Sequence, residues 1–193
     1  MSCLVGVLAM QGGYLEHQRM LASCGAETRL IRSVEDLSGI EGLIIPGGES
    51  TTMQILLQRS GLWEEIRLAL KDGLPAMGTC AGLILLSRHI TDGKVDQVSF
   101  DCLDIAVRRN GYGRQRESFE VPLEVSELGI FPGVFIRAPR ITDSGSSEIL
   151  ACHQGSPVAV RQGAVLGFCF HPELTGDNLF HHRFLNLVLG RKV

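Results

Sequence analysis

The chain has 193 residues and a formal net charge of -3, and 45% of its residues are hydrophobic while 20% are charged. This length and composition fit one globular domain that can bury a sizeable core. A weakly acidic chain offers no electrostatic basis for binding nucleic acid or an anionic membrane, so we expect neither as a partner.

The N-terminal segment MSCLVGVLAMQGG is apolar but does not have the pattern of a targeting segment. No positively charged stretch precedes the apolar run, and no small-residue cleavage site follows it. The run is also too short to span a membrane. We therefore expect a first core strand over residues 3–9 and a cytoplasmic protein.

The next segments alternate between helical and strand patterns. Helices are expected over residues 13–24, from Ser50 or Thr51 through Leu57, over residues 62–71, and from Ala81 to Leu86; strands are expected over residues 27–33, 41–48 and 74–77. This alternation predicts a parallel sheet with helices on both faces. Reactive groups in such sheets gather at the carboxyl ends of the strands.

From about residue 104 the pattern changes to short strands joined by Gly, Pro and Ser turns. The segments are DIAVRRN, SFEVPLEV, GVFIRAP, EILACHQG, SPVAVRQG and AVLGFCFHPE, followed by an amphipathic helix over residues 178–189. We therefore expect a single α/β domain over residues 1–193. Its largely parallel central sheet is flanked by helices and carries antiparallel strands in the C-terminal half.

Cys80 stands at the joint between an apolar strand and an apolar helix, in the segment GTCAGLILL. Gly78 and Gly82 permit a tight turn that exposes the thiol at the sheet edge. A helix amino end stabilises a thiolate, and the N–H of Ala81 can face a developing oxyanion. The G-x-C-x-G pattern alone leaves an inert buried cysteine as an equal alternative.

A base and a second oxyanion donor are found elsewhere in the chain. His171 closes an apolar strand, and Glu173 lies on the same side of the chain if the extended conformation continues past Pro172. A carboxylate there fixes the imidazole tautomer. The N–H of Gly48, after the buried strand IIPGG, can complete the oxyanion hole. The remaining histidines, at positions 17, 89, 153, 181 and 182, are expected to be surface or structural residues.

Two other kinds of site are less well supported by the sequence. A phosphate-binding role for Gly47 and Gly48 lacks the P-loop lysine and the G-x-G-x-x-G spacing. A zinc site built from Cys152, His153, Cys169 and His171 matches no common structural zinc spacing. The six cysteines contain no CxxC pair, so we expect free thiols and no metal.

The chain resembles the class I glutamine amidotransferase family over essentially its whole length. Three motifs carry this resemblance: the G-x-C-x-G elbow, the Pro46-Gly47-Gly48 turn and His171-Pro172-Glu173. Further segments are similar to the glutaminase subunits of pyridoxal 5'-phosphate synthase: AMQGGYLEH, PGGESTTM, GTCAGLILL, RRNGYGRQRESFE, FIRAPRI and FHPELTGD. Other stand-alone glutaminases of the class usually carry Gln or His a few positions after the elbow. Leu83 and Ile84 here favour the pyridoxal subunit. The resemblance implies a flavodoxin-like fold.

The resemblance also implies a role for each matching residue. Cys80 is the nucleophile, His171 the general base and acid, and Glu173 its orienting carboxylate; Gly47, Gly48, Glu49, Arg109, Ile136 and Arg137 bind glutamine, and Gln11 and Gly12 contact the partner. No metal or organic cofactor is needed for this hydrolysis. Arg108, Arg114 and Arg116 are interpreted instead as a solvated basic edge.

The implied partner is a separate synthase subunit, which receives ammonia and builds pyridoxal 5'-phosphate. In that family the glutaminase is weak alone and is activated by docking, so we expect the MQGG segment to help order the oxyanion hole. Two alternatives stay open at this point. The chain could be a non-catalytic binding module on the same fold, or another cysteine hydrolase such as a peptidase.

Overall fold

The computed structural model describes residues 3–94, 96–111, 118–126 and 128–190. The strands are β1 (Leu4–Leu8), β2 (Glu27–Ile31), β3 (Gly42–Ile45), β4 (Ala76–Thr79), β5 (Ser87–Ile90), β6 (Leu103–Arg108), β7 (Ser118–Val125), β8 (Gly129–Ile136), β9 (Arg140–Asp143), β10 (Glu148–His153), β11 (Ser156–Gln162) and β12 (Val165–Phe168). The helices are α1 (Tyr14–Ser23), α2 (Ser50–Arg59), α3 (Leu62–Lys71), α4 (Ala81–Leu86) and α5 (Leu179–Val188), with short 3-10 turns η1 (Val34–Leu37) and η2 (Pro172–Leu174).

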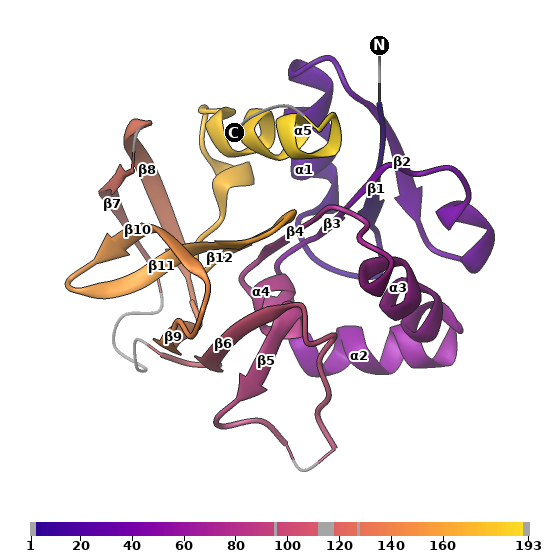
Figure 1. Cartoon of the computed structure of the whole chain (residues 1–193), viewed down its shortest axis with the longest axis horizontal. Coiled ribbons are helices and arrows are strands. Elements are labelled where there is room, and N and C mark those ends of the chain that lie inside the picture. The colour runs from indigo at the N-terminus through magenta and orange to yellow at the C-terminus, as the bar shows by residue number, and fades with distance from the viewer. Residues whose placement is uncertain (1–2, 95, 112–117, 127, 191–193) are drawn as a thin grey trace.

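Nine strands form the main sheet, in the order β2-β1-β3-β4-β12-β11-β10-β7-β8 (Figure 1). Strands β2, β1, β3, β4 and β12 pair in parallel with their neighbours. From β12 through β11, β10 and β7 to β8 every pairing is antiparallel. The expected α/β sheet, parallel in its first half and antiparallel in the C-terminal half, is confirmed.

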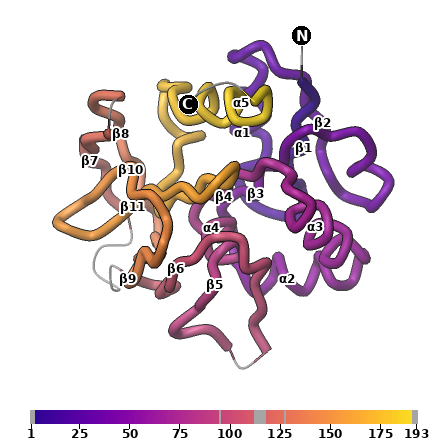
Figure 2. The backbone as a smooth tube through the Cα atoms, viewed as in Figure 1, coloured from indigo at the N-terminus to yellow at the C-terminus, as the bar shows by residue number. Residues whose placement is uncertain are grey.

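Helices cover both faces of the parallel strands. Figure 1 and Figure 2 show α1 and α5 together on one side and α2 and α4 on the other. Strands that are covered on both faces have continuous apolar sequences. Strand β3 is an example, since all four of its residues, GLII, are buried. Helix α3 instead buries a single stripe, Leu62, Ile66 and Leu70, at helical spacing. The buried apolar side chains form one continuous cluster.

The antiparallel strands show the alternation of a sheet with one buried face. In β8 the buried positions are Phe131, Gly133 and Phe135, each followed by a more exposed residue. Phe135 stacks on Phe119 of the neighbouring strand β7 with ring centroids 4.6 Å apart. Aromatic cross-strand pairs of this kind stabilise the β7–β8 hairpin.

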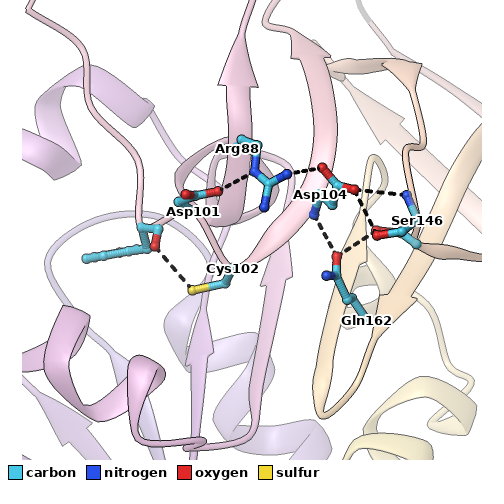
Figure 3. Close-up of polar contacts among 8 residues, drawn as sticks. Arg88, Asp101, Cys102, Asp104, Ser146 and Gln162 are labelled. Carbon is cyan, nitrogen blue, oxygen red and sulfur yellow. Dashed lines mark hydrogen bonds and ion pairs between the residues drawn. The ribbon is translucent and has the colours of Figure 1, made fainter.

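A second, three-stranded sheet has the order β5-β6-β9. Figure 3 shows how polar side chains tie it to the main sheet. Arg88 bonds to both Asp101 and Asp104, and the Asp104 carboxylate accepts from the N–H and hydroxyl of Ser146. The Asp104 backbone N–H donates to Gln162 Oε1 of β11 at 2.6 Å. This network fixes β6 against the end of β11.

The structure corrects several sequence expectations. Helix α2 is capped by Glu49, whose carboxylate accepts from the N–H groups of Thr51 and Thr52, whereas Ser50 or Thr51 was expected as the cap. Strand β4 covers residues 76–79, not 74–77. Strands β5 and β9 were not expected, because each has only four residues and exists through pairing with β6.

None of the helices in the described ranges has the length and apolar character needed to cross a membrane. The basic segment is only partly described: Arg108 is exposed, as expected for a solvated edge, whereas Arg114 and Arg116 lie outside the described residues.

The close packing of α4 on β3 makes a first prediction. A Cβ placed on Gly82 would lie 1.9 Å from the carbonyl oxygen of Ile45. We expect Gly82→Ala to lower the free energy of unfolding by about 2–3 kcal/mol, because backbone must move to relieve the clash. Urea unfolding of the purified chain measures this change.

Gly176→Ala is the matched control, since a Cβ at Gly176 meets no atom within 4 Å. We expect that variant to unfold within about 0.5 kcal/mol of the native chain. Equal stability of the two variants would show that β3 and α4 are not in such close contact.

Candidate active site

Cys80 occupies the bend between β4, which ends at Thr79, and α4, which begins at Ala81. Its backbone angles are φ 50 and ψ -102, which are unusual for a residue other than glycine. The Cys80 N–H donates to the carbonyl oxygen of Phe168 at 2.8 Å, so β12 holds the bend in place. The thiol therefore sits at the carboxyl edge of the sheet, at the amino end of α4.

His171 reaches the same edge because β12 pairs in parallel with β4, with Phe168 opposite Thr79. Three residues after this pairing, the N–H of His171 donates to the carbonyl oxygen of Val134 in β8, at 2.8 Å. The Cys80 side chain interacts with this imidazole and raises its pKa. Two residues that are distant in the sequence are thus brought into contact by one strand pairing.

Glu173 also reaches His171, although not by the expected route. The chain turns into the 3-10 segment η2 at Pro172 instead of remaining extended. Glu173 Oε1 nevertheless lies 2.7 Å from His171 Nδ1, and the carboxylate is almost fully buried, with 1% of the side chain exposed. This contact leaves His171 Nε2 as the nitrogen that faces Cys80.

The three side chains influence one another's protonation. Burial alone would lower the pKa of His171, but the hydrogen bonds to Cys80 and Glu173 and their charges outweigh burial and raise that pKa to about 10. Burial disfavours the Glu173 carboxylate, yet His17 and the hydrogen bond to His171 hold its pKa below the ordinary value. The site therefore favours an imidazolium beside a carboxylate.

These side chains open onto a cavity of about 280 Å³. Besides Cys80, His171 and Glu173, its lining includes Gly12, Gly47, Gly48, Glu49, Arg109, Ile136 and Arg137 from the sequence-based set. Gln11 and Ala81 belong to that set but lie beside the lining residues. Gly13, Ser50, Ile84, Asn110 and Leu174 also line the cavity and were not expected.

The Gly47-Gly48 turn is packed against the imidazole. A Cβ on Gly47 would lie 2.4 Å from His171 Cε1, and a Cβ on Gly12 would lie 1.6 Å from the Gly47 carbonyl oxygen. Only glycine allows this close backbone approach. The Glu49 N–H donates to Gln11 Oε1 at 3.4 Å, so the segment after β1 is attached to the same turn.

An ion pair forms another wall of the cavity. Arg109 Nη2 lies 2.8 Å from Glu49 Oε1, and Arg109 Nη1 donates to Gln97 Oε1 at 3.1 Å. Arg109 is thus already engaged, in part, by protein groups. Arg137 is exposed at the rim with a positive φ of 43, and the carbonyl oxygen of Ile136 lies 3.9 Å from Cys80 Sγ.

Sequence reasoning missed one polar neighbour of this group. His17 on α1 is fully buried, and its Nε2 lies 3.3 Å from Glu173 Oε2, the oxygen that does not face His171. The available signal was its spacing: His17 lies one helical turn before the buried Leu21, so it is on the core face of α1.

The other cysteines lie outside the cavity lining. Cys152 is exposed, and burial raises the pKa of Cys102 to about 11 and that of Cys169 further. High pKa values keep these two thiols protonated and unreactive. Within the described ranges, no three His, Cys, Asp or Glu side chains are grouped to hold a metal ion.

Comparison with known proteins places the chain in a family. The model of the SNO glutamine amidotransferase family matches residues 7–189. The pyridoxal 5'-phosphate synthase subunit PdxT of Clavibacter sepedonicus is 53% identical over 189 residues, which are 96% of this chain and 90% of that protein. The PdxT subunit of Thermoplasma acidophilum is 47% identical over 192 residues, covering 97% of this chain and 94% of that protein.

A solved structure described as a glutamine amidotransferase agrees with these matches. It has a TM-score of 0.90 and 47% sequence identity, and the match covers 95% of this chain and 98% of that one. The family model, the relatives and the fold therefore agree over nearly the whole sequence. The chain belongs to the SNO glutamine amidotransferase family.

Proposed function

We propose that this chain is the glutaminase subunit of a pyridoxal 5'-phosphate synthase. It hydrolyses L-glutamine to L-glutamate and ammonia and supplies the ammonia to a separate synthase subunit. The observation that carries this proposal is the contact of Cys80, His171 and Glu173 at one cavity, in a chain of the glutamine amidotransferase family. Relatives named as pyridoxal 5'-phosphate synthase subunits supply the destination of the ammonia.

In the proposed reaction, the Cys80 proton resides on His171, and the sulfur attacks the amide carbon of the glutamine side chain. The oxyanion that forms accepts hydrogen bonds from the N–H groups of Gly48 and Ala81; one such donor is typically worth about 3 kcal/mol of the barrier. The C–N bond then breaks, and His171 gives its proton to the departing ammonia. A thioester on Cys80 remains.

The second half of the reaction uses the same groups. His171, now neutral, takes a proton from water, and the resulting hydroxide attacks the thioester carbon. The C–S bond breaks, glutamate leaves, and the thiolate is again paired with the imidazolium. Glu173 keeps Nδ1 of His171 protonated, so that Nε2 faces the reacting atoms throughout.

Glutamine recognition is assigned to the charged wall and the glycine turn. We assign the α-ammonium group to Glu49, the α-carboxylate to Arg109 and Arg137, and backbone contacts to Gly47, Gly48 and Ile136. A cavity of about 280 Å³ is of the size of one amino acid, and it carries both signs of charge at its wall and rim.

The synthase subunit docks near the segment after β1. Gln11 and Gly12 are bonded to or packed against the Gly47–Glu49 turn, so contact at this segment reaches the oxyanion hole directly. Two apolar side chains support a docking surface there: Leu15 of α1 is 43% exposed, and Leu174, which lines the cavity, is 45% exposed.

We predict that glutaminase activity requires Cys80 and is increased by the partner. Glutamate release from glutamine should be slow for the chain alone and rise when the synthase subunit is added. Cys80→Ala should abolish release, because Cys80 is the one thiol among the described residues that line the cavity. Cys152→Ala is the control and should keep native activity, since Cys152 is exposed and outside the cavity lining.

A native complex that releases no glutamate would favour a non-catalytic binding module. Peptide cleavage without glutamine hydrolysis would favour a peptidase. Equal rates with and without the synthase would remove the activation by docking while leaving the glutaminase assignment in place.

The protonation state of His171 gives a further prediction. In the chain without substrate, the imidazole should remain protonated at neutral pH and titrate near pH 10, and Glu173→Gln should lower that pKa because a hydrogen-bonded negative charge is lost. NMR titration of ¹⁵N-histidine measures both values. Glu16→Gln, an acid on α1 that does not contact His171, is the control.

The raised pKa of His171 also makes the folding stability of the chain depend on pH. The folded-state pKa of His171 lies above its ordinary value of 6.5, so its contribution is complete below about pH 6.5 and is lost as pH rises toward 10. Urea unfolding at intervals across this range should show the native chain losing more stability than Glu173→Gln. A native His171 that titrates near 6.5 would contradict this interpretation.

The Glu49–Arg109 pair generates a prediction about glutamine binding. Arg109→Lys should raise KM for glutamine about tenfold, or about 1.4 kcal/mol, with a smaller effect on kcat, because lysine cannot bond to Glu49, Gln97 and a carboxylate from one planar group. Arg108→Lys, at the exposed neighbouring position, should leave KM unchanged. Equal KM values for the two variants would exclude Arg109 from the glutamine pocket.

A further inference from the structure

A second imidazole lies behind the carboxylate of the catalytic group. His17 Nε2 is 3.3 Å from Glu173 Oε2 and 3.2 Å from Thr79 Oγ1, and His17 Nδ1 is 2.9 Å from His181 Nε2. These residues come from α1, η2, β4 and α5, so four elements meet at one polar cluster. His17 is not among the residues that line the cavity in the described structure.

The cluster is closed to water. His17 and His181 are fully buried, and the Glu173 side chain is 1% exposed. Burial lowers the pKa of His17, although Glu173 and Glu16 act in the opposite direction. Burial and then His17 lower the pKa of His181 to about 3. Both rings are therefore neutral near pH 7, each with a single N–H.

The contacts of the two neutral rings determine where their protons lie. Glu173 Oε2 is buried and makes no hydrogen bond within the described residues, and His17 Nε2 lies 3.3 Å from it. A carboxylate only accepts hydrogen bonds, so a proton on Nε2 avoids turning a lone pair of His17 toward this oxygen, and we assign the proton to Nε2. His17 Nδ1 is then an acceptor, and the proton between the two rings belongs to His181 Nε2.

This assignment explains an otherwise unpaired atom. His181 Nδ1 is buried and has no hydrogen-bond partner among the described residues. In the assigned tautomer this nitrogen has no proton, so no buried N–H donor is left without an acceptor. The opposite tautomer would bury an unpaired N–H and would place two lone pairs against each other between the rings.

We propose that His17 is a positioning residue of the glutaminase reaction: its neutral Nε2–H donates to Glu173 Oε2 and aims Oε1 at His171. This inference rests on the proposed function, and it adds a directed chain of hydrogen bonds. His181 Nε2–H donates to His17 Nδ1, and His17 Nε2–H donates to one oxygen of Glu173. His171 Nδ1–H donates to the other oxygen.

The geometry gives His17 two effects on the reaction. The terminal carboxylate torsion of glutamate is broad, so a second donor is needed to hold Oε1 toward His171. A neutral donor also satisfies Oε2 without competing for the negative charge that stabilises the His171 imidazolium. Through Thr79, which accepts from the same N–H and precedes Cys80, the cluster also contacts the strand that carries the nucleophile.

The tautomers can be tested directly in the full native chain. Long-range ¹H–¹⁵N correlation spectra of ¹⁵N-histidine protein distinguish the two neutral tautomers from the charged ring, and His17→Gln and His181→Gln assign the signals. We expect His17 and His181 to be neutral and protonated on Nε2 at pH 7 to 8. A charged His17, or a proton on Nδ1 of either ring, would overturn the proposal.

Activity in the complex with the synthase tests the positioning role. We expect His17→Leu to lower kcat by roughly tenfold to a hundredfold and to leave KM for glutamine within about twofold, because the reacting groups are misaligned while the binding wall is intact. His17→Gln, whose amide N–H can reach Oε2, should recover kcat to within about threefold of native. His182→Gln, at the exposed neighbour of His181, is the control and should match the native enzyme.

The possible outcomes separate this inference from the proposed function. If the complex hydrolyses glutamine and a folded His17→Leu variant keeps the native kcat, the positioning role is refuted. The glutaminase assignment is then unaffected. A native complex without glutaminase activity would refute the proposed function, while the tautomers would still report on the cluster. If His17→Leu does not fold, the positioning role is tested by the tautomers in the native chain and by the kcat of His17→Gln.

Discussion

The parallel pairing of β4 with β12 is the contact on which the site depends. It is the only link in the described structure that puts Thr79 opposite Phe168, and the two chain segments that leave these residues carry Cys80 and His171. The Cys80 N–H bonds back to Phe168, so the bend that exposes the thiol is built into the same pairing. Without that register, the pairing of β4 with β12 would not bring the sulfur and the imidazole together. The antiparallel half of the sheet contributes by giving β12 its second neighbour and by supplying Val134, which fixes the backbone of His171.

Backbone packing around this pairing leaves little room for side chains. Gly82 faces the carbonyl of Ile45, Gly12 faces the carbonyl of Gly47, and Gly47 faces the imidazole. These approaches bring α4, the turn after β3, the segment after β1 and His171 together at one edge of the sheet, with no Cβ on the glycine side of each contact. The same packing places the segment after β1 directly against the Gly47-Gly48 turn, because the two backbones touch.

Electrostatic organisation follows from burial. The Glu173 carboxylate is almost completely removed from water, so its charge acts strongly on the groups around it. The pKa of the His171 imidazole is raised, so this ring is charged near pH 7, whereas the pKa of the His17 imidazole is lowered, so that ring is neutral. Burial lowers the pKa of the enclosed His17, although Glu173 acts in the opposite direction. At the cavity, the hydrogen bonds and charges of Cys80 and Glu173 outweigh burial and raise the pKa of His171. Of the two oxygens of this buried charge, Oε1 is bonded to His171 Nδ1, and Oε2 lies 3.3 Å from His17 Nε2.

Local patterns in the sequence determined much of this molecule. Apolar runs and helical spacing identified β1, β2, β3, α1, α3 and the α/β class, since these follow from burial of one stripe or of whole strands. The sequence also predicted the elbow around Cys80 and the His171-Pro172-Glu173 segment, because glycine and proline constrain the backbone locally. Local patterns did not predict four other features: strands β5 and β9, the Glu49 cap, the turn that brings Glu173 to His171, and the burial of His17. Each depends on a partner distant in the chain, and only the tertiary structure decides which distant groups meet and which of them lose contact with water.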